Sequence, residues 1–279
     1  MKRLYIYIIG IMLVQGVNAQ VTYQRADSIK ICQLLGQANR QTSVLWIARQ
    51  FLVVPYVAHT LEINDDERLV VNTRQLDCTT LVETVTALKL CVQDGKHAFA
   101  DYLNALRQLR YRQGRLNGYP SRLHYFTDWI RDKAAMQIVE DIQQPNPPFS
   151  AIQSVSVNYM STHPEAYKAL KANPSLVPEI RASEQSLSGL KVRYIPKRLL
   201  RNNALLRSVV KDGDILAITC NKKGLDIAHL GFAVWRKDGL HLLNASMLHK
   251  KVVEEPMTLW QYMQKHKTFT GIRVVRIKH

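Results

Sequence analysis

The hydrophobic period of this chain changes near residue 191, and that change constrains the fold more than any other feature of the sequence. Before it, apolar residues recur at the three- and four-residue spacing of amphipathic helices. After it, short runs of β-branched and aromatic residues are separated by turn residues, which is typical of strands. Helices in the first two thirds and a sheet in the last third predict an α+β fold.

The individual elements follow from the same periods. Helices are expected over 25–52 in two pieces, and over 97–110, 121–136, 163–171, 177–188 and 257–266. Strands are expected over 191–195, 213–219, 229–235, 240–246 and 271–277, with 68–72 either a short strand or an extended segment. The three prolines between Gln143 and Ser150 predict a loop or a subdomain boundary.

The N-terminus has the three parts of a secretory signal peptide. Lys2 and Arg3 precede an apolar run from Leu4 to Val14, and Val17-Asn18-Ala19 supplies small residues for cleavage. The run is shorter than the roughly 20 apolar residues that span a bilayer, so we expect removal of residues 1–19 and no membrane insertion afterwards. An uncleaved anchor is the alternative. Residues 20–279 would then form a single exported domain, located in the periplasm.

The chain is strongly basic, with a formal charge of +16, or +14 without Lys2 and Arg3. Such a charge suggests an anionic partner, which could be a cell-wall polymer, an acidic peptide or a membrane surface. The basic residues are dispersed and no nucleic-acid-binding motif accompanies them, so nucleic acid is not expected as a partner. A solvated basic surface would explain the charge as well.

Four cysteines follow the expected signal peptide, at positions 32, 78, 91 and 220. An even number in an exported protein permits disulfides, although a domain of this size does not need them. The sequence has neither a CxxC pair nor an HExxH motif, so we expect no metal ion and no other cofactor.

Cys78 differs from the other cysteines because an amphipathic helix begins at it. A helix N-terminus favours a thiolate over a thiol, and its free N–H groups can hold an oxyanion. Cys32 and Cys220 are expected to be structural, as is Cys91 on the apolar stripe. That stripe comprises Leu81, Val82, Val85, Leu88 and Cys91. Cys78 is therefore the candidate nucleophile.

His229 stands out among the nine histidines because it opens the strand-like run HLGFAVW. Alternation places His229, Gly231 and Ala233 on one face of that strand, and Gly231 leaves open space beside the imidazole. A histidine that merely caps a strand end is the simpler explanation. Whether His229 is a catalytic base or a strand cap depends on whether another residue orients its imidazole.

The length of the next loop decides which partner His229 has. If residues 236–239 form the whole loop, Asn244 in LHLLNAS lies diagonally from His229 on the same face, and His241 lies on the other face. A two-residue turn would keep the face but move Asn244 farther away, and a three-residue loop would exchange the faces. With the four-residue loop, Asn244 is the candidate that orients His229. A strand-end polar group, or a glycosylation acceptor in Asn-Ala-Ser, is the alternative for Asn244.

The motifs that carry these residues resemble the NlpC-type papain-like cysteine peptidases, which cut bacterial cell-wall peptides. They are VPY at 54–56, LDCTT at 76–80, HLG at 229–231 and NAS at 244–246. Longer segments are similar to exported bacterial N-acetylmuramoyl-L-alanine amidase-like proteins, from about residue 40 to the C-terminus. They are RQLDCTTLVE, RLHYFTDWI, NYMSTHP, YIPK, DGDILAIT and GLDIAHLGFAVW.

The resemblance implies a papain-like core, in which a helix-borne cysteine packs on an antiparallel sheet, with a helical insertion over about 95–205. It also implies hydrolysis of the amide between the lactyl group of muramic acid and L-Ala in peptidoglycan fragments, by a monomer. Cys78 would attack the carbonyl, His229 would take and return the proton, and Asn244 would hold His229.

Further residues are expected near the substrate or the oxyanion. Tyr56 matches a tyrosine that lines the family's cleft. Thr79 replaces the usual serine after the cysteine, and Asn244 stands where many relatives have histidine. The full set of expected contacts is Tyr56, Asp77, Thr79, Arg122, His124, Tyr125, Ser161 and Thr162. Each of the last five could equally make a local structural hydrogen bond.

Three other functions remain open from the sequence. A γ-D-Glu-diamino acid endopeptidase would use the same residues on a different amide. A non-catalytic wall-binding protein would keep the fold without the activity. A zinc amidase is a third, although His229, His241 and Cys220 lack the spacing of metal ligands.

Overall fold

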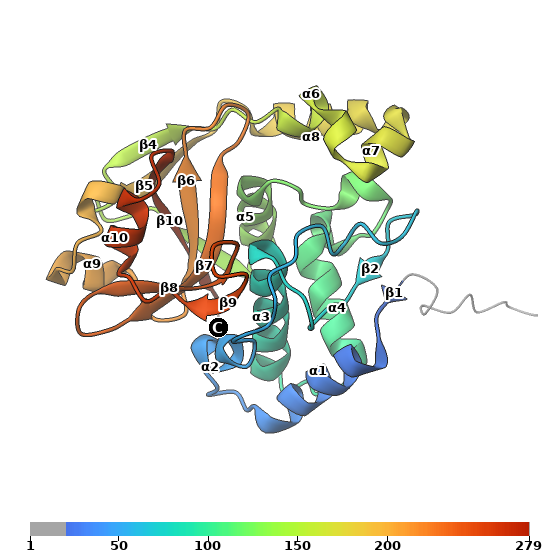
Figure 1. Cartoon of the computed structure of the whole chain (residues 1–279), viewed down its shortest axis with the longest axis horizontal. Helices are drawn as coiled ribbons and strands as arrows, with labels where there is room; N and C mark the ends of the chain where they lie inside the picture. The colour runs from blue at the N-terminus through green and yellow to red at the C-terminus, as the bar shows by residue number, and fades with distance from the viewer. Residues whose placement is uncertain (1–20, 279) are drawn as a thin grey trace, which may run out of the picture.

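The computed structural model describes residues 21–278. The expected signal peptide, residues 1–19, lies outside this range. Helices and an antiparallel sheet form separate layers (Figure 1), which confirms the mixed α+β architecture.

The helical layer begins at the N-terminal end of the described chain. The α-helices are α1 (Arg25–Gln37), α2 (Val44–Arg49), α3 (Cys78–Gln93), α4 (Phe99–Arg110), α5 (Phe126–Ala135), α6 (Tyr159–Thr162), α7 (Lys168–Ala172), α8 (Val177–Leu187), α9 (Ala204–Val209) and α10 (Leu259–Gln264). Short 3₁₀ helices cover Arg112–Gly114, Tyr119–Ser121, Pro164–Ala166, Pro174–Leu176 and Lys197–Leu199. The expected helices are therefore present, with the 163–171 segment broken into short pieces.

The main sheet is antiparallel and runs in the order β4-β5-β10-β6-β7-β8-β9, with β3 also paired to β10. Its strands are β3 (Val139–Ile142), β4 (Ala151–Ser154), β5 (Lys191–Pro196), β6 (Ile215–Cys220), β7 (Ile227–Trp235), β8 (Leu240–Ser246), β9 (Lys251–Glu254) and β10 (Phe269–Ile277). A separate parallel pair joins β1 (Val21–Thr22) to β2 (Leu69–Val70). The stretch over 95–205 holds strands as well as helices: the expected strand at 191–195 is β5, whereas β3 and β4 were not expected.

Two hydrophobic clusters cover the two faces of the sheet. One packs α1 to α5 against Leu230, Phe232 and Val234 of β7. The other packs α9 and α10 against Ala233 of β7 and Leu242 of β8. Figure 1 shows the sheet between these two sets of helices.

A third cluster lies under the helices α6 to α8, which form a cap at one end of the molecule (Figure 1). It includes Tyr125, Val157, Met160, Leu170 and Ile180.

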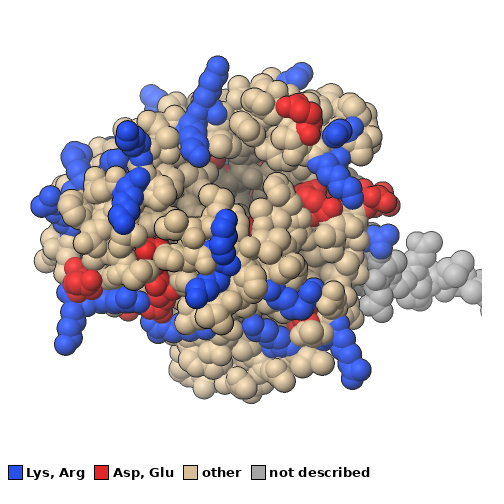
Figure 2. All heavy atoms as spheres, viewed as in Figure 1, with Lys and Arg blue, Asp and Glu red and all other residues tan. Residues whose placement is uncertain are grey.

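No helix between residues 21 and 278 is long and apolar enough to cross a membrane. In Figure 2, Lys and Arg side chains are spread over the visible face, and a hollow opens near its centre.

The four cysteines are all free thiols. Cys91 and Cys220 are buried, as expected for structural residues. Cys32 is instead exposed on α1, unlike the structural residue that was expected at this position. The reason is that α1 buries only one side, through Ile31, Leu34 and Leu35.

Candidate active site

A capping box fixes the start of α3 and with it the position of Cys78. The Asp77 carboxylate accepts a hydrogen bond from the backbone N–H of Thr80 at 2.8 Å, and the Thr80 hydroxyl accepts one from the N–H of Asp77 at 2.9 Å. These reciprocal bonds make Asp77 the N-cap residue and Cys78 the first residue of the helix. Asp77 therefore has a structural role that the sequence analysis did not assign.

The β7–β8 hairpin brings His229 and Asn244 together. Trp235 pairs with Leu240, so residues 236–239 form a four-residue loop, and the register expected for that loop is confirmed. His229 Nε2 lies 2.9 Å from Asn244 Oδ1. The Asn244 amide is oriented by its Nδ2–H, which donates to the carbonyl of Leu242 at 3.3 Å. Nε2 of His229 is therefore the protonated nitrogen, and Nδ1 is free to accept a proton.

His241 lies on the opposite face, as expected. Its Nδ1 is 2.9 Å from the carbonyl of Glu255, and its Nε2 is 3.0 Å from Asp238. It is fully buried in these contacts and takes no part in the site.

The space beside Gly231 is filled, contrary to the expectation from the sequence. A Cβ atom there would lie 2.6 Å from the carbonyl oxygen of Leu243 and 2.7 Å from the side chain of Leu242. The glycine thus permits a close approach of β8 to β7 beside His229.

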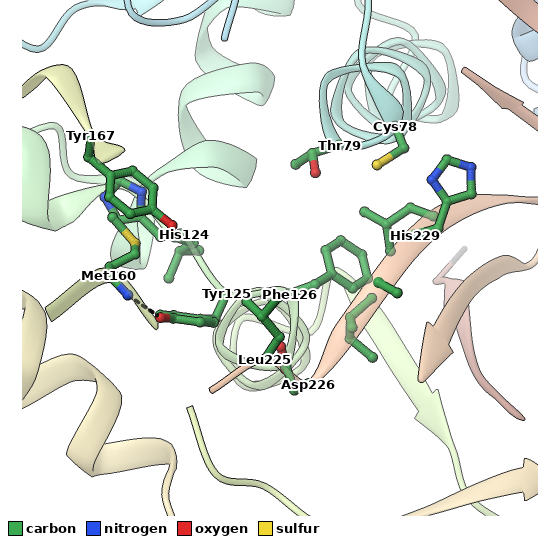
Figure 3. Close-up of a pocket in the computed structure, with 14 residues that line it drawn as sticks. Cys78, Thr79, His124, Tyr125, Phe126, Met160, Tyr167, Leu225, Asp226 and His229 are labelled. Carbon is green, nitrogen blue, oxygen red and sulfur yellow. Dashed lines mark hydrogen bonds between the residues drawn. The ribbon is translucent and has the colours of Figure 1, made fainter. Parts of the chain in front are cut away.

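Cys78 and His229 line one end of a cavity of about 250 Å³. Figure 3 shows the imidazole of His229 beside Cys78, with a ring nitrogen turned towards the thiol. Backbone hydrogen bonds from Leu230 and Thr79, and one from the Thr79 side chain, also reach the sulfur. Helix α3 and strand β7 therefore supply the two reactive groups from different parts of the chain.

The electrostatics differ from the expected thiolate. Burial raises the pKa of Cys78 to about 12, and the negative charge of Asp77 adds to this effect. Burial also lowers the pKa of His229, and the hydrogen bond to Asn244 only partly opposes it. Both shifts favour a neutral thiol beside a neutral imidazole, because desolvation of Cys78 outweighs the hydrogen bonds that its sulfur receives. Such a pair can act by passing the thiol proton to the imidazole as the sulfur attacks.

Tyr56 and Thr79 lie near Cys78. Tyr56 forms an isolated bridge with Leu76, two residues before the cysteine. Burial raises the pKa of Tyr56, and the negative charges of Cys78 and Asp77 contribute, which places the phenol close to both. Thr79 lines the cavity directly.

His124 and Tyr125 also line the cavity, but their polar atoms have partners within the protein. His124 Nε2 is 3.0 Å from the carbonyl of Tyr119, and burial lowers the pKa of His124 to about 3. The Tyr125 hydroxyl donates to Glu184 at 2.7 Å and accepts from the N–H of Met160 at 3.0 Å. The two hydrogen bonds of Tyr125 join the cavity wall to α8 and α6 of the cap.

Arg122 lies in a second hollow of about 240 Å³, which shares Thr79, His124 and Tyr167 with the first. Its guanidinium is buried and forms ion pairs with Glu62 and, at 3.6 Å, with Glu67. The arginine is therefore occupied by carboxylates of the protein.

Ser161 and Thr162 are not among the residues that line either hollow. The N–H of Ser161 donates to Glu184 at 3.1 Å, and the Thr162 hydroxyl donates to the carbonyl of Asn158 at 2.7 Å. Both residues make local hydrogen bonds around α6, which is the alternative that the sequence left open for them.

Several wall residues were missed by sequence reasoning. Phe126, Leu225 and Asp226 line the cavity from α5 and the approach to β7, and Met160 and Tyr167 line it from the cap (Figure 3). Phe126, Met160, Leu225 and Asp226 fall in segments that carry the family resemblance, which could have indicated them. Nothing in the local sequence marks Tyr167, because the packing of the cap brings it to the cavity. Within residues 21–278, no group of His, Cys, Asp and Glu side chains could hold a metal ion.

A family model and several solved structures match this chain. Residues 46–272 match the model of the AmiA-like family, described as N-acetylmuramoyl-L-alanine amidase-like. An N-acetylmuramoyl-L-alanine amidase from Bacteroides uniformis is 41% identical, with a TM-score of 0.79 over 85% of this chain and 98% of its own. A Bacteroides fragilis protein, provisionally described as a xylanase, is also 41% identical, with a TM-score of 0.77 over 83% of this chain and 100% of its own.

A more distant structure shares the fold. A Legionella pneumophila protein is 21% identical, with a TM-score of 0.70 over 91% of this chain and 95% of its own. No curated protein matches the sequence.

Proposed function

This chain belongs to the N-acetylmuramoyl-L-alanine amidase-like family, and we propose that it hydrolyses the amide between the lactyl group of muramic acid and L-Ala in peptidoglycan fragments. Cys78 is the nucleophile, His229 the base and Asn244 the residue that orients His229. The single observation that carries this proposal is the hydrogen bond of 2.9 Å between His229 and Asn244, at the cavity end where Cys78 begins α3. The NlpC-type, papain-like placement belongs to the same proposal.

The reaction follows from the positions of the free groups. His229 Nδ1 takes the proton from Cys78 Sγ as the sulfur bonds to the amide carbonyl carbon. The N–H of Thr80 is occupied by Asp77 and the N–H of Thr79 by the Cys78 sulfur, which leaves the N–H of Cys78 as the backbone donor to the oxyanion. Tyr56, whose phenol lies near Cys78, assists it.

Collapse of the oxyanion breaks the C–N bond. His229 returns its proton to the departing L-Ala nitrogen, and the muramoyl group remains as a thioester on Cys78. Water then attacks this thioester with His229 again as the base, which gives the free lactyl carboxylate and restores the thiol.

We further propose a setting for this activity. Residues 1–19 direct export to the periplasm, where the chain acts as a monomer on soluble muropeptides and without a cofactor. The cavity supports a short substrate, because α5 and the cap residues Met160 and Tyr167 wall it in.

The test is a digest of defined muropeptides by purified protein, with products identified by mass spectrometry. Release of a sugar-free peptide that begins with L-Ala is expected. Cys78→Ala should abolish it, whereas Cys32→Ser, which changes an exposed cysteine on α1, should not. Activity should persist in a chelator, unlike that of a zinc amidase.

Two results would contradict the proposal. If L-Ala-D-Glu stays on the sugar, the chain is a γ-D-Glu-diamino acid endopeptidase. If no muropeptide is cleaved but the chain still sediments with purified wall, it is a non-catalytic wall-binding protein.

A further inference from the structure

A carboxylate lies buried behind the His229–Asn244 pair, on the same face of the sheet. Glu255 follows β9, and its N–H donates to the carbonyl of Leu242 at 2.8 Å, so Glu255 lies opposite Leu242. Leu242 and Asn244 are two residues apart on β8 and share a face. Asn244 on β8 therefore lies between His229 on β7 and Glu255, the residue that directly follows β9.

Few donors compensate the charge of Glu255, which has no exposed surface. Its Oε2 is 3.2 Å from His249 Nε2, and its Oε1 has no hydrogen-bond partner. Burying an ionised carboxylate in this way is unfavourable. A role near the imidazole of His229 explains the burial of Glu255 better than packing does.

Other titratable groups face the same region from every neighbouring element. The start of α3 contributes Cys78 and Asp77, α10 contributes Tyr262, and the residues after α10 contribute His266. The positive charge of Lys222 lowers the pKa of His266. His249, in the turn after β8, pairs with Glu255.

The negative charge of Glu255 raises the pKa values of three of these groups, His229, His266 and Tyr262. Burial lowers the pKa values of His229 and His266, and the negative charge of Glu255 opposes both changes. Burial raises the pKa of Tyr262 to about 12, and Glu255 contributes to the increase.

Glu254 provides a natural contrast, because its side chain points to the other face of β9. It pairs with Arg49 at 2.6 Å and with Arg236 at 2.8 Å. Two adjacent glutamates thus differ in burial, in partners and in the face that they occupy.

We propose that Glu255 is a positioning residue, whose carboxylate behind Asn244 stabilises the imidazolium that His229 becomes when it takes the Cys78 proton. The inference rests on the proposed function for the base role of His229. No bond forms to Glu255. The proton moves from Sγ to Nδ1, Nε2–H stays with Asn244, and Glu255 supplies the negative charge that a neutral asparagine lacks.

The direct test measures the pKa of His229 by NMR in full-length mature protein carrying Cys78→Ala, where no thiol titrates beside the ring. The signal is assigned by its loss in His229→Asn. Glu255→Gln is expected to lower the pKa of His229 by about half a unit or more. Glu254→Gln removes the same charge from the other face and should leave the pKa unchanged.

A kinetic test uses the chain with Cys78 intact and a muropeptide substrate. Glu255→Gln is expected to lower kcat roughly tenfold with little change in KM, and to move the acid limb of kcat/KM to lower pH. Glu255→Asp restores the charge and should recover most of kcat.

An unchanged His229 pKa in folded Glu255→Gln overturns the proposal, as does an equal shift in Glu254→Gln. If Glu255→Gln does not fold, Glu255→Met removes the charge without leaving a buried amide and carries the same expectation. Because the titration needs no substrate, the two failures are distinguishable. If the pKa of His229 shifts as expected but no muropeptide is cleaved, the proposed function is contradicted, and only the electrostatic effect of Glu255 on His229 is retained.

Discussion

At the scale of single residues, Asp77 has two opposite effects on the site. As the N-cap it starts α3 and so places Cys78 at the cavity. As a negative charge it adds to the burial that raises the pKa of Cys78. The same charge raises the pKa of His229, against the larger effect of burial. Asparagine separates the two effects, because it also caps helices but carries no charge.

Asp77→Asn should therefore lower the pKa of the Cys78 thiol. In a His229→Ala background, where the thiol titrates without a base beside it, Cys78 should react with iodoacetamide roughly three to ten times faster at a fixed pH below its pKa. Mass spectrometry of the peptide that contains Cys78 measures this without interference from Cys32. Asp94→Asn, at the far end of α3, is the matched control and should change nothing. An equal or slower reaction in Asp77→Asn would show that its charge does not reach the sulfur.

The geometry of single residues was predictable where it depends on nearby sequence. The alternation of β7 and the loop of residues 236–239 together place Asn244 beside His229. The raised pKa of Cys78 was not predictable, because it comes mainly from burial, to which residues far along the chain contribute. The ion pairs of Arg122 were not predictable for the same reason, since Glu62 and Glu67 lie far from it along the chain.

At the scale of elements, the site depends on how closely β7 and β8 approach each other beside His229. Gly231 makes that approach possible, because any Cβ there would meet the Leu243 carbonyl oxygen at 2.6 Å. A backbone atom cannot move aside as a flexible side chain can. The strands would have to separate or slide.

Gly231→Ala should consequently damage stability and activity together. We expect a loss of about 1–3 kcal/mol in the free energy of unfolding, measured with urea. A lower kcat should accompany it, because His229 and Asn244 are on the two strands that are pushed apart. Gly36→Ala is the control, since a Cβ at Gly36 on α1 has nothing within 4 Å. A stable and fully active Gly231→Ala protein would show that the hairpin adjusts without moving the pair.

Long elements were easier to predict than short ones. The sixteen residues of α3 and the nine of β7 give several repeats of their period. By contrast, β3, β4 and β9 have four residues each, which is too few for a period to be distinguished from chance. Their place in the sheet is set by pairing with β10, β5 and β8, and no local pattern encodes such pairing.

At the scale of the whole molecule, buried ion pairs connect segments that local sequence cannot relate. Arg122 forms ion pairs with Glu62 and Glu67. It lines the second hollow together with His124, and so connects this acidic segment to the wall of the site. Burial raises the pKa of Glu67, and Arg122 is the first of the charges that oppose this. Of the two roles that the sequence left open for Arg122, a substrate contact and a structural bond, this arrangement favours the structural one.

Arg122→Ala should therefore act on stability in a pH-dependent way. Loss of the guanidinium leaves buried carboxylates unpaired, and we expect a loss of about 3–5 kcal/mol in the free energy of unfolding at neutral pH. Without Arg122 the pKa of Glu67 rises further above its unfolded value, so the protonated form is favoured in the folded state. Such a group gives up its stabilisation as the pH rises through its folded pKa, and the deficit should accordingly shrink as the pH falls. Urea unfolding at pH 7.5 and pH 5 measures both effects, with the exposed Arg115→Ala as the control. A stable Arg122→Ala protein with a raised KM would instead make Arg122 a substrate contact.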